Sequence, residues 1–235
     1  MKLVHHGVLL KKINYSETSL ILQFYTKEKG IQSYIFQGGK KKKGNGLQVL
    51  NIVEIEAFLR PESELGKITR VHSNYVFKDI PFNPIKCGLA FFLAELLIKS
   101  LKATGCEPKT YDFIEQEIKW LDDATHLTNY PFWFVLRFSS FLGFSPRIID
   151  EQPLFFDLQE GELIRSLPTN QLYIKNDAVK WIKWMLISNK NETLEKQIPK
   201  TIRTLLLETL LDYYAFHLEE FKQLKSLNVL KTIFL

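Results

Sequence analysis

The sequence predicts an α+β protein in which a five-stranded β-barrel is followed by an α-helical domain. In the first 80 residues, hydrophobic side chains alternate with polar ones in five short runs, as in strands with one buried face. After Pro81 they recur at intervals of three and four, as on the buried side of a helix. The 235 residues are 46% hydrophobic, enough to form a core in each part. We therefore expect one domain over residues 1–80 and a second over residues 81–235.

The five predicted strands are separated by breaks at residues 14–17, 27–30, 38–46 and 60–64, where charged residues, Gly or Pro interrupt the pattern. Five short strands in about 75 residues fit a small barrel, and the OB-fold is the commonest five-stranded solution. The alternating positions are Val8 and Leu10; Leu20, Leu22 and Phe24; Ile31, Ser33 and Ile35; Val53, Ile55, Ala57 and Leu59; and a run from Gly66 to Phe77.

The helical part begins with a capping signal, because Asn83 is followed by Pro84. We expect helices from there to about Gly105, over residues 110–123 and 131–142, after Asp177, and from Pro199 onward. Between the third and fourth helices, residues 154–167 resemble a hairpin that turns at Glu160-Gly161.

Positive charge is concentrated at the N-terminal end. Residues 1–80 contain 13 Lys and Arg against 7 Asp and Glu, whereas the remaining 155 residues contain 18 against 19. Such an asymmetry favours contact between the first domain and a polyanion.

The most conspicuous motif is a run of four lysines, Lys40 to Lys43, with glycines on both sides. Adjacent ammonium groups repel one another, so solvent or phosphate must screen them, and glycines let the backbone approach an anion. Taken alone, the run is equally compatible with a solubilising hairpin tip. Aromatic residues lie among the cations of the same domain, which favours binding of unpaired nucleic acid by phosphate contacts and base stacking. The candidate DNA-binding residues are Lys11, Lys12, Lys40, Lys41, Lys42, Lys43, Arg60, Lys67 and Arg70, and the interleaved rings are Tyr25, Tyr34, Phe36, Phe58, Tyr75 and Phe77.

Signals for other classes of protein are absent. Cys87 and Cys106 form no CxxC pair, the five histidines have no metal-ligand spacing, and no catalytic motif occurs. The longest apolar stretch, Leu89–Ile98, is shorter than the roughly 20 residues that span a bilayer, and no secretory signal opens the chain. We expect an intracellular protein without catalytic residues, metal, cofactor or membrane contact.

Arg137 lies within an otherwise apolar run, Phe132 to Phe138. Its guanidinium group could simply extend from the helical domain into solvent, or it could bind a carboxylate at the edge of an apolar pocket. The basic tail around Lys225 is compatible with a solvated closing helix.

Several segments together resemble RecO, the bacterial recombination mediator family. They include Tyr15 to Leu22 (YSETSLIL), Phe24 to Gly30, the Gly-Gly-Lys turn at 38–43, Phe134 to Pro146, and Lys225-Ser226-Leu227. The resemblance implies an OB-fold that binds single- and double-stranded DNA, annealing of strands coated with single-strand-binding protein, and loading of RecA together with RecR. It also implies that the helical domain binds the acidic tail of single-strand-binding protein, for which we select Arg137 and Lys225, and a cytoplasmic, nucleoid-associated location.

The chain departs from the family in one respect. Many members have a four-cysteine zinc site after the third helix, where residues 148–161 contain no cysteine. We therefore predict no zinc, and a hairpin near residues 150–167 that packing of Leu154, Phe155, Phe156 and Leu158 holds in place. A protein-interaction adaptor with little direct DNA binding is the main alternative function, and a metal-dependent nuclease is a distant third.

Overall fold

A computed structural model describes residues 2–41, 46–58, 65–102, 105–219, 221 and 224–234. The chain divides into two compact units, which are described separately. Unit 1 comprises Met1–Asp123 and Leu224–Ser226, and unit 2 comprises Ala124–Gln223 and Leu227–Leu235.

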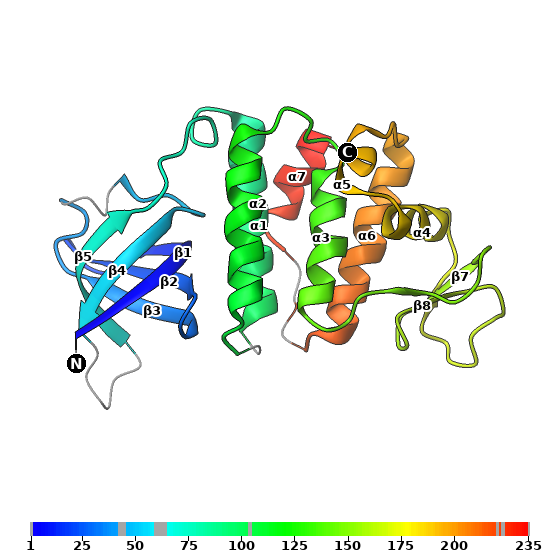
Figure 1. Cartoon of the computed structure of the whole chain (residues 1–235), viewed down its shortest axis with the longest axis horizontal. Coiled ribbons are helices and arrows are strands. Elements are labelled where there is room, and N and C mark those ends of the chain that lie inside the picture. Colours follow the sequence, from blue (N-terminus) through cyan, green and yellow to red (C-terminus); the bar gives the residue numbers. More distant parts are fainter. Residues whose placement is uncertain are drawn as a thin grey trace. The chain divides into compact units, whose positions relative to one another are not determined.

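Unit 1 contains the predicted five-stranded barrel (Figure 1). The strand order β1-β2-β3-β5-β4 closes on itself, with β3 and β5 parallel and the other pairs antiparallel. Closure leaves no free sheet edge, and the arrangement fits an OB-fold, which confirms the predicted fold class. The strands are β1 (Lys2–Asn14), β2 (Leu20–Thr26), β3 (Gly30–Phe36), β4 (Ile52–Phe58) and β5 (Leu65–Ser73).

Strand β1 closes the barrel because its 13 residues pair with two neighbours. Its first half pairs with β4 and its second half with β2, and a bulge between Leu9 and Lys11 accompanies the change of partner. Within the largely apolar interior, His5 Nδ1 and the Tyr34 hydroxyl form a hydrogen bond of 2.7 Å. Burial raises the pKa of Tyr34 to about 12 and lowers that of His5, so this interior pair is uncharged at neutral pH. His5 is thus a core residue.

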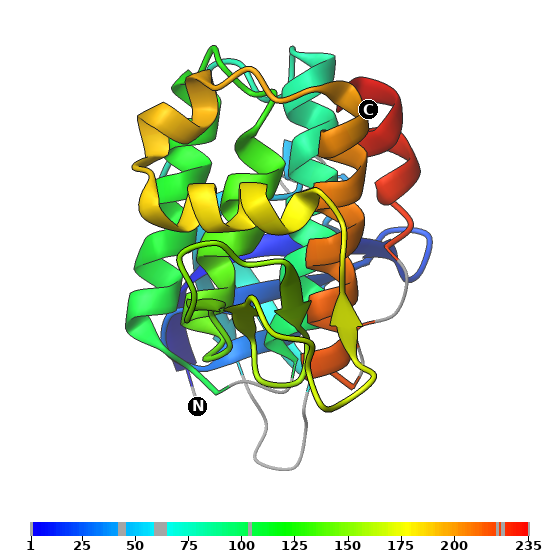
Figure 2. The same cartoon turned by 90° about the vertical axis from the view of Figure 1, so that its right-hand side faces the viewer.

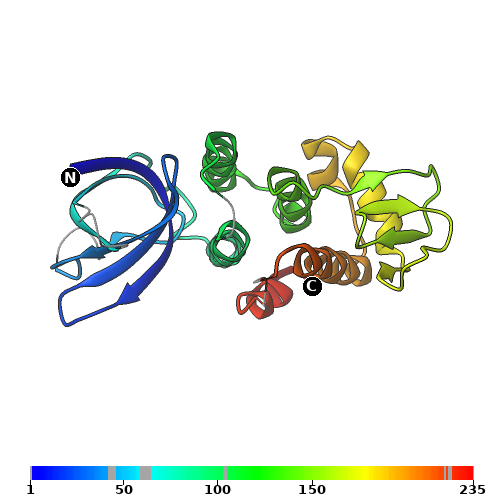
Figure 3. The same cartoon turned by 90° about the horizontal axis from the view of Figure 1, so that it is seen from below.

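Helices α1 (Pro84–Leu101) and α2 (Pro108–Asp123) complete unit 1 and are seen end-on beside each other in Figure 3. The Asn83 side chain caps α1 as predicted, by accepting hydrogen bonds from the backbone N–H groups of Ile85 and Lys86. The end of β2 packs on α2, where Tyr25 stacks on Tyr111 with ring centroids 6.3 Å apart.

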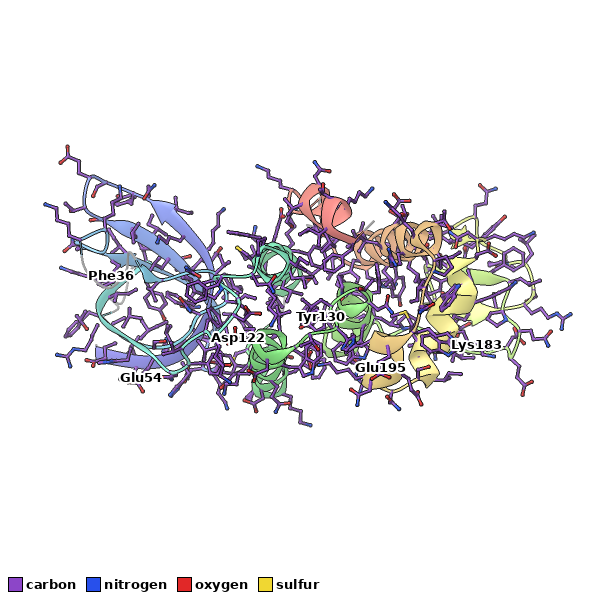
Figure 4. The ribbon with its side chains drawn as sticks, turned by 90° about the horizontal axis from the view of Figure 1, so that it is seen from above. Phe36, Glu54, Asp122, Tyr130, Lys183 and Glu195 are labelled. Atoms are coloured by element: carbon purple, nitrogen blue, oxygen red, sulfur yellow. The ribbon has the colours of Figure 1, made fainter. Side chains whose placement is uncertain are left out.

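Asp122, near the end of α2, fixes the segment that leaves the barrel (Figure 4). Its buried carboxylate accepts hydrogen bonds from the backbone N–H groups of Lys78, Asp79 and Ile80, at 2.7–3.0 Å. The Tyr75 hydroxyl donates to it as well, at 3.1 Å. Burial opposes ionisation of Asp122, but these hydrogen bonds outweigh burial and hold its pKa below the ordinary value.

Unit 2 combines helices with a small sheet of strand order β6-β8-β7-β9. Figure 2 shows α4 lying across α6, against which it packs. The elements are α3 (Tyr130–Phe141), β6 (Arg147–Ile148), β7 (Phe155–Asp157), β8 (Glu162–Ile164), β9 (Tyr173–Ile174), α4 (Ala178–Ile187), α5 (Lys190–Glu195), α6 (Lys200–His217) and α7 (Leu227–Phe234).

The cysteine-free hairpin β7–β8 turns at Gly161, whose φ of +67° favours glycine. It is held by aromatic packing from α6: the rings of Phe156 and Tyr213 lie 4.7 Å apart, and the His217 ring hydrogen-bonds the Leu158 carbonyl at 2.8 Å. Of the four residues expected to hold the hairpin, Phe155 and Phe156 are buried, whereas Leu154 is 45% exposed. The expectation for Leu154 was therefore wrong.

Candidate nucleic-acid interface

A row of outward-pointing side chains crosses all five strands of the barrel. Ile13, Ile21, Ile35, Lys67 and Phe58 are successive cross-strand partners on β1, β2, β3, β5 and β4. Ile21, Ile35 and Lys67 each lie between buried residues along their strands, so their side chains point away from the core, and Ile13 and Phe58 are themselves exposed. At about 4.8 Å per strand, the row extends over about 19 Å of curved surface.

A second outward row lies beside the first. Lys11, Gln23, Ser33 and Leu65 are successive partners on β1, β2, β3 and β5, and the Gln23 side-chain amide donates to the Ser33 hydroxyl at 3.5 Å. We call the two rows together the barrel face: Lys11, Ile13, Ile21, Gln23, Ser33, Ile35, Phe58, Leu65 and Lys67.

The barrel face combines exposed cations with exposed apolar groups. Lys11 and Lys67 are exposed near its two sides, and Phe58, next to Lys67, is 50% exposed. Ammonium groups can contact phosphates here while the apolar side chains contact bases.

The remaining described lysines of the prediction lie at the rim of the barrel. Lys12 is exposed at the end of β1 opposite the buried Leu22, and its Nζ donates to the Leu47 carbonyl at 3.2 Å. The Lys40 backbone N–H donates to the Thr18 carbonyl at 3.1 Å, which places the start of the lysine run beside the β1–β2 loop. Lys41 follows in the same turn. The structure therefore associates Lys40 and Lys41 with the β1–β2 loop, next to where the barrel face begins on β1 and β2.

Arg70 lies in a different electrostatic environment. It is further along β5, where its guanidinium group is 3.7 Å from the Glu56 carboxylate and His72 approaches the same group. On β1, which pairs with the other side of β4, His6 lies between Glu28 and Glu54. The carboxylates make this part of the outer surface unfavourable for phosphate, so Arg70 is not grouped with Lys11 and Lys67. The predicted residues Lys42, Lys43 and Arg60 lie outside the described residues.

Most of the aromatic residues noted in the sequence belong to the core. Tyr25, Tyr34, Phe36 and Phe77 are buried, and Tyr75 is half-buried against Asp122, which leaves only Phe58 exposed among those six. Tyr15, 60% exposed in the β1–β2 loop, was missed as a candidate. Its position in a break between strands was the signal that could have identified it, because rings in loops seldom belong to a barrel core.

Arg137 lines a pocket in unit 2 with a volume of about 290 Å³. The walls come from α3 and from the junction of α4 and α5, with Leu136, Met185 and Leu186 as apolar groups. Lys190 adds a second cation, with its ammonium group 4.3 Å from the centre of the Trp133 ring. An exposed guanidinium group beside apolar walls can bind a carboxylate next to a hydrophobic side chain.

Lys225, the other predicted partner-binding residue, belongs to unit 1. Its backbone N–H and that of Ser226 donate to the Glu95 carboxylate of α1, at 2.9 and 2.8 Å, and its own side chain is exposed. These hydrogen bonds attach residues 224–226 to α1. Lys225 and Ser226 therefore have a structural role that involves no ligand.

Two further properties bear on function. Within the described residues, no group of three or more His, Cys, Asp or Glu is arranged to hold a metal ion. In the same part of the chain, none of the helices combines the length and the hydropathy needed to cross a membrane.

Comparison with known proteins gives matches over nearly the whole chain. The family models described as "Recombination protein O N terminal" and "Recombination protein O C terminal" match residues 1–76 and 81–228. The DNA repair protein RecO of Phocaeicola vulgatus is 32% identical over 234 residues, which cover 97% of each chain. That of Flavobacterium psychrophilum is 30% identical over the full length of both chains, and that of Bacteroides fragilis is 29% identical over 97% of each.

Proposed function

Because this chain belongs to the RecO family of DNA repair proteins, we propose that it is a recombination mediator that binds single- and double-stranded DNA and anneals complementary strands. With RecR, it would help to load RecA onto DNA coated by single-strand-binding protein. Such a mediator changes the arrangement of strands and proteins, without making or breaking covalent bonds. We place it in the bacterial cytoplasm, associated with the nucleoid.

The observation that carries the proposal is the barrel face. It has exposed cations near both sides, and its centre consists of isoleucine side chains and two uncharged polar groups. Phosphates of any sequence can pair with Lys11 and Lys67, and bases of any sequence can pack on apolar groups and on Phe58. Sequence-independent binding of unpaired strands is what annealing requires, whereas duplex DNA would be bound through its phosphates alone.

A fluorescence-anisotropy titration with a labelled unpaired oligonucleotide tests direct binding. At low salt we expect saturable binding at micromolar protein or below, and affinity that falls steeply as salt rises because phosphate contacts release counterions. An unchanged anisotropy at micromolar protein would instead favour the adaptor function, in which the barrel hardly contacts DNA. Shortened products after incubation with Mg²⁺ would indicate a nuclease.

The pocket around Arg137 supports the second part of the proposal, contact with single-strand-binding protein. The acidic tail of that protein would place its terminal carboxylate on Arg137 and its apolar side chains against Leu136 and Met185.

We expect Arg137→Ala to weaken binding of a synthetic tail peptide by about tenfold or more, since a charged hydrogen bond contributes about 1.5–3 kcal/mol. Isothermal titration calorimetry measures this effect, with Arg147→Ala as the control because Arg147 is engaged by Glu162 at 2.8 Å. Equal peptide affinity for Arg137→Ala and the wild-type protein would remove Arg137 from the proposal.

A further inference from the structure

Helix α4 in unit 2 presents an outward stripe of mixed character. Lys180, Lys183, Trp184 and Ile187 follow one another at helical spacing, opposite the buried residues Ala178, Val179, Ile182 and Met185. We call these four residues the α4 stripe; Lys183 is labelled in Figure 4. Ile187 is 67% exposed and Trp184 is partly exposed, although solvated helix faces are mostly polar.

The α4 stripe lies in the most basic part of unit 2. Residues 175–203 contain seven Lys and Arg against three Asp and Glu, although the chain beyond residue 80 carries a net charge close to zero. Among the described residues, Lys180, Lys183, Lys196 and Lys200 have no carboxylate within ion-pair distance, unlike Lys27 and Lys78 of unit 1. The Lys183 ammonium group donates a hydrogen bond to the Glu151 carbonyl, which leaves its charge uncompensated. Their positive charge is therefore available to a polyanion.

Rings and ammonium groups alternate around this part of unit 2. The Lys196 ammonium group lies 5.6 Å from the centre of the Trp184 ring, and Trp181 meets Trp184 edge-on with centroids 5.8 Å apart. On the other side of the α4–α5 junction, Lys190 lies over Trp133. A partly exposed indole flanked by cations provides the two contacts that unpaired nucleic acid needs, a stacking surface and phosphate partners.

We infer that the α4 stripe, together with Lys196, is a second binding surface for single-stranded nucleic acid, distinct from the barrel face. The inference rests on the proposed function, because annealing requires two strands to be held by the protein. The stripe faces away from the helical core, and the residues that line the peptide pocket, Met185 and Leu186, occupy other positions on α4. A continuous anion with stackable bases suits an open stripe of cations and rings, whereas a peptide carboxylate suits the pocket.

Energy transfer between two labelled strands tests the inference. Donor- and acceptor-labelled oligo(dT) cannot anneal to each other, so transfer reports two strands held in one complex. The wild-type protein is expected to produce transfer, and Lys180→Gln/Lys183→Gln is expected to weaken the second-strand affinity about fivefold or more. Trp184→Ala should weaken it by a similar factor, since a base would lose its stacking partner. Anisotropy with one strand should change less than twofold, because the barrel face is intact.

The control variant Lys109→Gln/Lys231→Gln removes the same charge at exposed positions away from α4, and both readouts should match the wild-type protein. Energy transfer in Lys180→Gln/Lys183→Gln equal to that of the wild-type protein would overturn the inference. So would a wild-type protein that binds one strand to saturation but produces no energy transfer. Neither result would contradict the proposed function. Loss of one-strand binding in the α4 variant would contradict the assignment of the barrel face instead. Loss of binding to anionic lipid vesicles, with transfer unchanged, would assign the stripe to a membrane surface and also overturn the inference.

Discussion

Asp122→Ala is expected to lower the free energy of unfolding of unit 1 by about 3–5 kcal/mol, because a buried charged acceptor is lost and its donors are left unsatisfied. Three consecutive backbone N–H groups and the Tyr75 hydroxyl point at this carboxylate, and Ile80 is itself buried. Urea denaturation followed by circular dichroism measures the effect. The neighbouring Asp123→Ala is a matched control, since Asp123 is exposed and pairs with the exposed Lys78 at 2.8 Å.

The same carboxylate makes the stability of unit 1 depend on pH. The pKa of Asp122 lies below its ordinary value of 3.8 in the folded protein, so its stabilising effect is complete above that value and is lost as the pH falls further. Glu95 acts in the same direction. Burial raises its pKa, but hydrogen bonds from the backbone N–H groups of Ser226 and Lys225 outweigh burial and hold the pKa below the ordinary value of 4.5. Asp122→Ala should therefore flatten the loss of stability below about pH 4. An equal acid dependence in Asp122→Ala and the wild-type protein would contradict this role.

Changing Lys40 to Lys43 together to alanine is expected to weaken binding of unpaired DNA about a hundredfold at 0.1 M salt, and to reduce the slope of log affinity against log salt by about 3. Each of these four ammonium groups, which are adjacent in the sequence, would release a counterion on contact with phosphate. The loss of affinity should be the same for DNA of different sequences, because lysines that contact phosphates do not contact the base edges. Anisotropy titrations at several salt concentrations measure both quantities.

The charge-matched control replaces four lysines that are already engaged or remote, Lys78, Lys109, Lys119 and Lys231. It should retain most of the affinity and of the salt slope. If the Lys40–Lys43 variant binds as tightly as this control, the lysine run is a solubilising tip and not a contact for phosphate.

The strand pattern predicted the barrel well because its strands have one buried face. Leu20, Leu22 and Phe24 occupy alternate positions of the second strand, and all three lie in the core. In the third strand the alternation indicated the wrong face, because the core there is formed by Tyr34 and Phe36, whereas the alternating set of Ile31, Ser33 and Ile35 is only partly buried. The fifth strand ends at Ser73 and not near Phe77, because residues 78–80 are engaged by Asp122, a contact 42–44 residues away that no local pattern reveals. Similarly, the helix expected from Pro199 onward ends at His217, before Phe221, which the hydrophobic spacing had included in it.

The sequence identified the candidate cations, but it did not show which of them lie together on one surface. Composition identified Lys11, Lys67 and Arg70 equally, and only the cross-strand register separates the first two from Arg70, which faces Glu56. The aromatic residues illustrate the same limit, since alternation cannot distinguish the exposed Phe58 from the buried Tyr34 without the strand partners. The basic segment around α4 was missed because the net charge of the chain beyond residue 80 is close to zero.

Photo-crosslinking of a bound oligonucleotide, followed by mass spectrometry, tests the location of the DNA site most directly. We predict crosslinks in peptides that contain Tyr15 and Phe58, the two most exposed rings of the barrel, with further crosslinks at Trp184 when strand is in excess. Crosslinks confined to the outer surface around Glu54 and Glu56, or found only beyond residue 80, would show that the barrel face does not hold the strand.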